Sequence, residues 1–320
     1  AYCDHWVSNV FSRTEFLDTL KDTLGFTPKV DFNAGVVAAG EAQIESTVTG
    51  NTSASKLSDK KEALRDQSQV YLPINNALSS VGHVHGFLKE LGQGVQHVAS
   101  RVENLVDFVQ RANDNRVMTG EGFTFLNIPR SYYGILTTEQ LVDGTVLDEN
   151  FDGLSEECAN VVMEVLEAAQ VLTRNGAIDL DQTEDSIDCI LEKRLDGIVL
   201  EEYHNKRKCA LGVILCSRYK NLYSLLRHHV SEAKYLGIVR NKILVDIQGE
   251  DLLYQIFTSS ILQRQPGEEA PFFEFIQRVC SECTDAQGCP QKVRPGCGGF
   301  GIRNFLTLFL SIEVNKAMQD

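Results

Sequence analysis

The sequence predicts an α+β fold in which two similar strand-then-helix modules are combined with further strands and one block of helices. The first observation is a weak internal repeat at an offset of 92 residues (97 minus 5), which aligns residues 5–17 with residues 97–109. The second is a set of alternating segments late in the chain, and the third is a helical periodicity over residues 135–240. Together they indicate one duplicated domain with a helical insertion.

Each copy of the repeat begins with an alternating segment that is typical of a strand. In both copies a histidine lies on the apolar face at the matching position, His5 in the first and His97 in the second. Apolar residues at helical spacing follow: Phe16, Leu17, Leu20 and Leu24 in the first copy, and Leu105, Val106, Phe108 and Val109 in the second. Chance similarity is the competing explanation. The repeat predicts two modules that each present one histidine from their first strand.

Later segments supply the remaining strands. Residues 69–74 and 272–279 have strand-like patterns, and residues 242–248 and 252–258 flank a tight turn, as in a hairpin. The polar stretch 51–68 is interpreted as an exposed loop or a short solvated helix. The strands and the repeat place the first module and the start of the second in residues 1–134, with the rest of the second module in 241–320.

Residues 135–240 are predicted to be a helical insertion. Ser155 is a candidate N-cap because two glutamates and an apolar periodicity follow it, and Thr183 is a second candidate. A third helix is predicted from Leu200 to Leu226, where apolar residues recur at helical spacing.

Charge and hydropathy exclude two classes of function. The chain has 30 basic and 44 acidic residues, and its net charge is −14 at pH 7. General nucleic-acid binding is disfavoured because a surface this negative repels a phosphate backbone. No apolar run is long enough to span a bilayer, so we expect no transmembrane segment.

The nine cysteines are an odd number in a chain of this length, which argues against a secreted disulfide framework. We therefore expect free thiols in an intracellular, reducing compartment, with the cytoplasm favoured. The chain begins at Ala1 without a signal pattern, and import into an organelle by a removed N-terminal peptide stays open.

Three residues carry the predicted chemistry: His5, His97 and Glu274. Two neutral imidazoles and one carboxylate form the ligand set of non-haem Fe(II) oxygenases, which leaves positions open for substrate and dioxygen. All three lie at predicted core-facing strand positions, where a carboxylate is costly unless a cation pairs with it. A single strand histidine is more often packed or hydrogen-bonded than bound to metal, so the prediction depends on convergence of the three.

Six short blocks resemble the 4-hydroxyphenylpyruvate dioxygenase family, in the family's order along the chain. They are residues 4–9 (DHWVSN), 72–75 (LPIN), 94–99 (GVQHVA), 253–258 (LYQIFT), 273–278 (FEFIQR) and 296–301 (GCGGFG). The resemblance is to the catalytic, C-terminal half of that family and extends over nearly the whole chain. It implies the vicinal-oxygen-chelate fold, a half-open β-barrel of paired βαβββ modules around a metal.

The resemblance also implies roles for the residues that match the family's motifs. His5, His97 and Glu274 would bind Fe(II), and Gln255 would lie beside the iron. The polar residues around the substrate's aromatic end would be Ser46, Asn75 and Gln96. The rest of the substrate pocket would be formed by Pro73, Phe257, Phe300, Asn304 and Phe305, and a C-terminal helix within residues 241–320 would cap it.

The implied reaction is a decarboxylating hydroxylation of a 2-oxo acid by dioxygen, and conversion of 4-hydroxyphenylpyruvate to homogentisate is favoured. Benzylic hydroxylation to a mandelate uses the same ligands and is one alternative, although Phe257 and Phe300 favour ring attack slightly. A non-catalytic family member that serves as a protein subunit is the other alternative. The implied partners are a small 2-oxo acid and dioxygen, and a homo-oligomer or a protein partner through residues 135–240 stays open.

Four features depart from the family. Only four residues precede His5, so we expect the family's additional N-terminal domain to be absent from this chain. The gap from His97 to Glu274 is much longer than the gap from His5 to His97, because residues 135–240 lie within it. Where the family has a further glutamine, this chain has residues 82–85 (GHVH), so a substrate contact is missing or replaced. Residues 302 and 303 (IR) stand in place of the family's usual Lys-Gly.

Other local patterns have simpler explanations. Four cysteines at 280, 283, 289 and 297 invite a zinc site, but their irregular spacing favours free thiols in a loop. Residues 179–190 lack the glycine and the final glutamate of a calcium loop, so helix capping is preferred. The histidines at 83, 85, 228 and 229 are interpreted as surface or partly buried, and the basic residues 206–208 as one solvated helix face.

Overall fold

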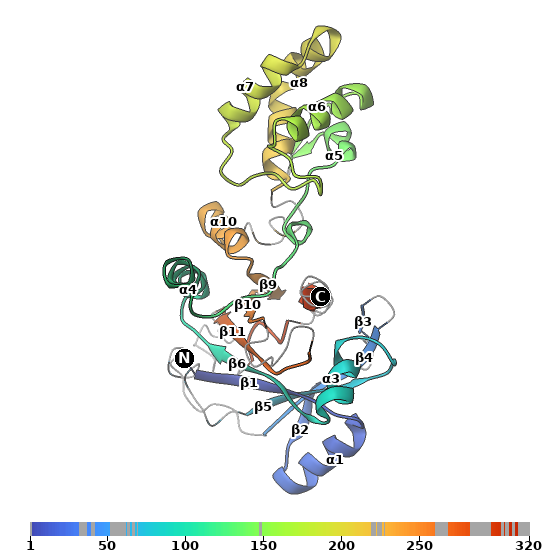
Figure 1. Cartoon of the computed structure of the whole chain (residues 1–320), viewed down its shortest axis with the longest axis vertical. Coiled ribbons are helices and arrows are strands. Elements are labelled where there is room, and N and C mark those ends of the chain that lie inside the picture. Colours follow the sequence, from blue (N-terminus) through green and yellow to red (C-terminus); the bar gives the residue numbers. More distant parts are fainter. Residues whose placement is uncertain are drawn as a thin grey trace, which may run out of the picture. The chain divides into compact units, whose positions relative to one another are not determined.

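A computed structural model of the chain divides into two compact units (Figure 1). It describes residues 2–31, 37–39, 42–51, 70–146, 149–218, 228–259, 268–281 and 296–301, and the single residues 62, 65, 68, 222, 226, 304, 307, 308, 311 and 312. Unit 1 comprises residues 1–128 and 241–320, and unit 2 comprises Pro129–Arg240. The sequence pattern predicted the helical block at 135–240, so its predicted start lies a few residues after the start of unit 2.

Unit 1 is built on one nine-stranded sheet with the order β2-β4-β5-β1-β6-β11-β10-β9 and with β3 paired to β4. The strands of its first half are β1 (Tyr2–Asn9), β2 (Thr27–Asp31), β3 (Val37–Ala39), β4 (Ala42–Gly50) and β5 (Tyr71–Ala77). Those of the second half are β6 (Gly94–Arg101), β9 (Leu244–Gln248), β10 (Asp251–Phe257) and β11 (Phe272–Val279). Figure 1 shows β5, β1 and β6 side by side in this sheet.

The two halves of the sheet repeat one topology. β1 pairs in parallel with β5, and β6 pairs in parallel with β11. β1 and β6 pair with each other in antiparallel fashion and join the halves. Each half has a helix after its first strand, α1 (Arg13–Leu24) or α4 (Leu105–Thr119). This is the paired βαβββ arrangement of the vicinal-oxygen-chelate fold, curled into a half-open barrel, and the predicted fold class is confirmed.

The internal repeat extends to the helix caps. Ser12 caps α1 by accepting a hydrogen bond from the Glu15 amide, and Asn104 caps α4 by accepting one from the Asp107 amide. Ser12 and Asn104 lie at the same offset that relates His5 to His97. A side-chain oxygen at this position satisfies an amide that has no partner within the helix. Equivalent signals therefore start both helices.

The strand predictions for unit 1 are confirmed with one correction. Residues 272–279 form β11, and the predicted hairpin is β9 and β10, with Asp251 opposite Gln248. The strand predicted over residues 69–74 is instead β5, which continues to Ala77. It continues because Asn75 and Asn76 remain in the ladder with β4, opposite Ser46 and Glu45. Residues 52–61, most of the predicted loop at 51–68, lie outside the described residues.

Unit 2 is mainly helical. Its helices are α5 (Thr138–Asp143), α6 (Glu156–Ala168), α7 (Glu184–Arg194), α8 (Gly197–Cys216) and α10 (Glu232–Arg240), with a short 3-10 helix over Arg130–Tyr132 and two short strands, β7 (Thr145–Val146) and β8 (Glu149–Asn150). The predicted caps are confirmed, because the Ser155 and Thr183 side chains accept from the Cys158 and Ser186 amides. Apolar side chains of α5 to α8, such as Leu141, Leu166 and Leu191, form its core. Across the described residues, no helix combines the length and the apolar character needed to cross a bilayer.

Two predictions in this unit are wrong. The helix predicted from Leu200 to Leu226 ends at Cys216, and no glycine or proline marks that end. The basic residues 206–208 do not form one solvated helix face, because the backbone departs from helical geometry at Lys206. The Lys206 ammonium donates to the Gly153 carbonyl at 2.5 Å, and Arg207 pairs with the buried Asp188.

Candidate metal centre

Three neighbouring strands bring the three predicted ligands together. His5 lies on β1, His97 on β6 and Glu274 on β11. Ala99 on the middle strand is the register partner of both His5 and Glu274, so these two side chains flank a residue with only a methyl group. His97 lies two residues before Ala99 and therefore projects from the same face of the sheet. The small residue leaves room for the three side chains to converge.

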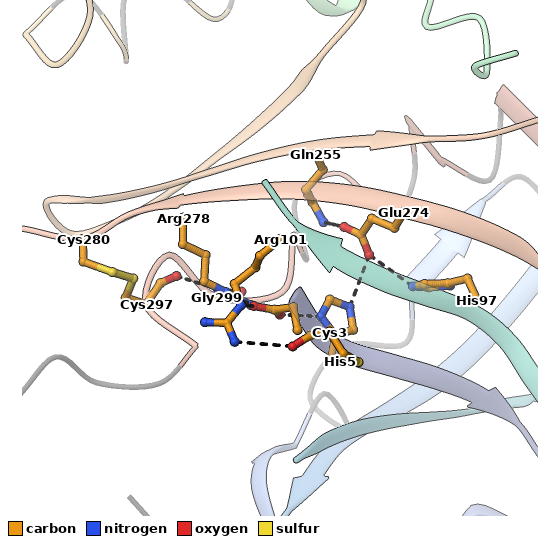
Figure 2. Close-up of polar contacts among 11 residues, drawn as sticks. Cys3, His5, His97, Arg101, Gln255, Glu274, Arg278, Cys280, Cys297 and Gly299 are labelled. Carbon is orange, nitrogen blue, oxygen red and sulfur yellow. Dashed lines mark hydrogen bonds and ion pairs between the residues drawn. A yellow bond between two sulfur atoms is a disulfide. The ribbon is translucent and has the colours of Figure 1, made fainter. Parts of the chain in front are cut away.

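The ligand atoms of these residues lie within 4.8 Å of one another, and all three residues are buried. Nε2 of His5 and Nε2 of His97 are each 3.2 Å from the same carboxylate oxygen, Oε2 of Glu274 (Figure 2). The two imidazole rings stand nearly perpendicular, with an interplanar angle of 76°. Two nitrogens and one oxygen thus face a common point from three directions.

Hydrogen bonds at the other ring nitrogens fix how the imidazoles face that point. Nδ1 of His5 is 2.7 Å from Oδ1 of Asp4, and Nδ1 of His97 is 2.8 Å from Oε1 of Gln96. Both oxygens can only accept, so both Nδ1 atoms carry a proton. In a neutral ring Nε2 then presents its lone pair, which is the form that ligates a metal.

Charges around the centre shift the pKa values of all three residues. Burial alone would raise the pKa of Glu274, but the two histidines beside the carboxylate outweigh burial and lower the pKa to about 2. Burial would lower the pKa of His5, but Asp4 and Glu274 raise it to about 9. Burial lowers the pKa of His97, and the nearby Glu274 opposes this only in part. His97 is therefore neutral at pH 7, and its lone pair faces a carboxylate oxygen.

The donor set fits a divalent cation. A lone pair and a carboxylate oxygen 3.2 Å apart repel each other unless positive charge lies beside them. In the metal-free chain the proton on His5 supplies that charge, and a metal ion would supply it more completely while accepting all three donors. Two imidazoles and one carboxylate suit Fe(II) and leave further positions for small molecules.

Asp4 is held in turn by Arg278, which donates hydrogen bonds to both of its carboxylate oxygens at 2.8 Å. The same guanidinium donates to the carbonyls of Cys297 and Gly299 at 2.5 and 2.7 Å. Burial would raise the pKa of Asp4, but Arg278 outweighs it and holds the pKa well below its usual range. Asp4 is therefore ionised and orients His5 through the proton on Nδ1.

A pocket adjoins the three residues. It is lined by the predicted residues His5, Pro73, Asn75, Gln96, His97, Gln255, Phe257, Glu274 and Phe300, and by Val7, Val48 and Leu308, which the sequence did not single out. Ser46 is buried and lies opposite Asn75 in the β4–β5 ladder. Phe305 lies outside the described residues.

Gln255 connects the carboxylate to the C-terminal segment. Its amide nitrogen donates to Oε1 of Glu274 at 2.8 Å, and its amide oxygen accepts from Nδ2 of Asn304 at 2.9 Å. Gly301 has φ of +70°, and a Cβ built there would lie 2.0 Å from the Gln255 amide oxygen. Only glycine therefore lets the backbone approach so closely. This arrangement leaves Oε2 of Glu274 free to face the two imidazoles.

The cysteine prediction needs a correction. Cys280 and Cys297 form a disulfide, so the expectation of free thiols is wrong at these two positions (Figure 2). Their Cα atoms are 5.7 Å apart, a normal separation for a disulfide. The end of β11 and the glycine-rich segment 296–301 meet there, which an odd total of cysteines could not reveal. Cys283 and Cys289 lie outside the described residues.

Comparison with known proteins identifies similar enzymes. The 4-hydroxyphenylpyruvate dioxygenase of Plectranthus scutellarioides is 36% identical over 102 residues, which are 32% of this chain and 22% of that protein. The enzyme of the same name from Daucus carota is 41% identical over 96 residues, 30% of this chain and 20% of that protein. The chain resembles 4-hydroxyphenylpyruvate dioxygenases. The match spans about a fifth of the length of these relatives.

Two further comparisons complete this result. A solved structure of a mutant 4-hydroxymandelate synthase from Streptomyces coelicolor has 15% sequence identity and a TM-score of 0.49, and it covers 99% of this chain and 54% of that one. No protein-family model matches the chain.

Sequence reasoning missed the residues that hold the predicted ligands. Asp4 and Arg278 lie inside the blocks that resemble 4-hydroxyphenylpyruvate dioxygenase, and a carboxylate directly before a candidate ligand was the available signal for Asp4. His83 was interpreted as a surface or partly buried residue, which is wrong. It is buried because it pairs with Glu269, 186 residues away. No sequence pattern indicated that pair.

Proposed function

We propose that this chain carries the catalytic centre of an Fe(II)-dependent dioxygenase that decarboxylates and hydroxylates an aryl 2-oxo acid. The observation that carries the proposal is the orientation of His5 and His97. Acceptors hold both Nδ1 protons, and both Nε2 atoms lie 3.2 Å from one oxygen of Glu274. The resemblance to 4-hydroxyphenylpyruvate dioxygenases supports the same metal and substrate class.

His5, His97 and Glu274 would hold the metal, and Fe(II) bound there would activate dioxygen for a reaction in which oxidative decarboxylation of the 2-oxo acid supplies two electrons. One ionised carboxylate leaves a net charge of +1 on a divalent site. That charge attracts the carboxylate of a 2-oxo acid into a chain whose overall charge is −14. Gln255 keeps Glu274 oriented, while Phe257 and Phe300 line the pocket and exclude water from it.

Two polar atoms of the chain favour a substrate whose ring carries a hydroxyl group. Within the part of the chain that the structure describes, Oγ of Ser46 and Oδ1 of Asn75 are buried and have no hydrogen-bond partner. Buried polar atoms without partners are unfavourable, so a bound group that satisfies both would be stabilised. A phenol hydroxyl can donate to Asn75 and accept from Ser46 at once. This pattern favours 4-hydroxyphenylpyruvate over phenylpyruvate.

The test is oxygen uptake with Fe(II) and 4-hydroxyphenylpyruvate, measured together with bound iron. We expect uptake by the wild-type chain and a loss of at least ~100-fold in His97→Ala, since even partners of ligands contribute 10–100-fold. His85→Ala is the matched control, because His85 is on a neighbouring helix and does not line the pocket. Equal uptake by the wild type and His97→Ala would sink the proposal.

Product analysis in the same assay separates the two reactions. Homogentisate is expected, and a 4-hydroxymandelate product would reassign the chain to benzylic hydroxylation with the same ligands. No uptake and no bound iron in the wild type would instead favour a non-catalytic subunit.

A further inference from the structure

The amide of Gln96 lies between two buried imidazoles. Its oxygen accepts from Nδ1 of His97 at 2.8 Å, and its nitrogen is 3.0 Å from Nε2 of His83. An amide nitrogen can only donate, so Nε2 of His83 must accept. The remaining proton of a neutral His83 ring is therefore on Nδ1.

The Nδ1 proton of His83 has a definite acceptor. Nδ1 lies 3.0 Å from Oε2 of Glu269, and both side chains are 3% exposed. The hydrogen bonds thus run in one direction, from His97 to Gln96, from Gln96 to His83 and from His83 to Glu269. We call these last three residues, Gln96, His83 and Glu269, the relay.

Residues of helix α3 (His83–Leu91) form the binding site for the Glu269 side chain and backbone. The backbone amide of Glu269 donates to Oε2 of Glu90 at 2.9 Å. A Cβ built at Gly86 would lie 2.6 Å from Oε1 of Glu269, so only glycine leaves space for this carboxylate. His83, Gly86 and Glu90 lie on this one helix and contact Glu269 at three places. Phe272, three residues further on, stacks on the His97 ring at 4.9 Å.

The two candidate ligands are therefore anchored in parallel ways. A carboxylate, Asp4, holds Nδ1 of His5 directly, whereas a carboxylate holds Nδ1 of His97 through an amide and a second imidazole. Carboxylates behind metal-bound histidines fix the ring orientation and the tautomer. We propose that His83 and Glu269 are positioning residues that, through Gln96, hold His97 in the tautomer that presents Nε2 to the metal. This proposal rests on the proposed function, because it assigns the relay to the same metal centre.

The relay also fixes the orientation of one residue that lines the pocket. Gln96 lines the pocket while His83 and Glu269 do not, so these two residues reach the pocket through the Gln96 amide. Reversing that amide would turn its NH₂ group toward Nδ1 of His97 and favour the wrong tautomer. The relay opposes this reversal, because a neutral His83 ring that donates from Nδ1 to Glu269 presents only a lone pair at Nε2, which would then face the amide oxygen.

Substitutions at position 83 separate positioning from packing. His83→Gln keeps an acceptor for Gln96 and a donor for Glu269, whereas His83→Phe keeps the ring and removes both. His85→Phe is the matched control on the same helix. Co(II) is the probe, because its visible absorption reports coordination by imidazole and carboxylate. We expect Co(II) affinity to fall about 10–100-fold in His83→Phe and to stay within about 3-fold of wild type in the other two variants.

A second measurement needs no metal and no destabilising variant. In the metal-free wild-type chain labelled with ¹⁵N-histidine, we expect the His83 ring to be the Nδ1–H tautomer, with its signals assigned by their loss in His83→Gln. An Nε2–H tautomer of His83, or equal Co(II) affinity in His83→Phe and wild type, overturns the relay and leaves the proposed function standing. Absence of Co(II) binding in the wild type overturns the proposed function itself.

Discussion

The two units bury different chemistry. The core of unit 2 consists of apolar side chains from α5 to α8, including Leu141, Leu166 and Leu191. Unit 1 buries a connected set of charged and polar groups: Asp4, His5, Gln96, His97, Gln255, Glu274 and Arg278. Such groups oppose folding unless each is paired. The difference indicates that the core of unit 2 is stabilised by apolar burial, as in most domains. Unit 1 instead buries polar groups where they hold the metal centre in place.

The largest effect is expected from a substitution that breaks the ion pair between Arg278 and Asp4 in unit 1. Arg278→Met leaves Asp4 buried with less compensation, and we expect a loss of about 3–5 kcal/mol in the free energy of unfolding. Metal affinity should fall as well, because Asp4 orients His5. Urea unfolding and hydrogen exchange of the unit 1 strands would measure this. Arg111→Met, an exposed arginine on α4, is the control; equal losses in the two variants would contradict the prediction.

Removing a core side chain of unit 2 should affect stability without affecting the metal centre. Leu166 is fully buried, and Leu166→Ala should cost about 2–5 kcal/mol, because it removes apolar contacts and leaves a cavity. Ile198 is 85% exposed, and Ile198→Ala should change stability by about 0.5 kcal/mol or less. Co(II) affinity should equal that of wild type in both. A weaker affinity in Leu166→Ala alone would mean that the two units are energetically coupled.

The protonation states of His5 and Glu274 in unit 1 should make metal binding depend on pH. The pKa of His5 is raised to about 9 and that of Glu274 is lowered to about 2, so at pH 7 the metal-free centre holds one proton between the ligand atoms, on Nε2 of His5, that a metal must displace. Affinity should therefore rise about 10-fold per pH unit from about pH 7 to 9. In the metal-free chain the raised pKa stabilises the fold below about pH 6.5, and this contribution is lost as pH rises through about 9. Calorimetry in buffers of different ionisation enthalpy should find about one proton released per metal ion at pH 7. Affinity that is constant over this range would refute the assignment.

The smallest expected effect concerns a helix cap in unit 2. Oγ of Ser155 accepts from the Cys158 amide at 3.2 Å and donates to Oε2 of Glu202 at 2.6 Å. Ser155→Ala should cost about 1 kcal/mol and speed hydrogen exchange in the first turn of α6. Ser155→Thr should retain most of that stability. Both variants should bind Co(II) like the wild type. A change in Co(II) affinity would contradict the expectation that unit 2 does not contribute to metal binding.

The sequence predicted those features that local patterns record. The repeat located both histidines because the pairing of β1 with β6 needs the same alternation in each copy. Cap residues marked α6 and α7 because an unpaired amide at a helix start selects an oxygen side chain. The end of α8 was missed because apolar spacing continues beyond Cys216 without a breaking residue. His83 and Glu269 were missed because their pairing depends on tertiary structure, and neither has a periodic signal.

Parallel pairing of β11 with β6 has a consequence for biosynthesis. In the first module α1 ends at Leu24 and β2 begins at Thr27, but in the second module all of unit 2 is translated between α4 and β9. His5 and His97 therefore leave the ribosome well before Glu274, while their strands can already pair. The carboxylate arrives only with β11, after all of unit 2 has been translated. A nascent chain cannot acquire the full ligand set early, so metal loading would report that synthesis of the barrel is complete.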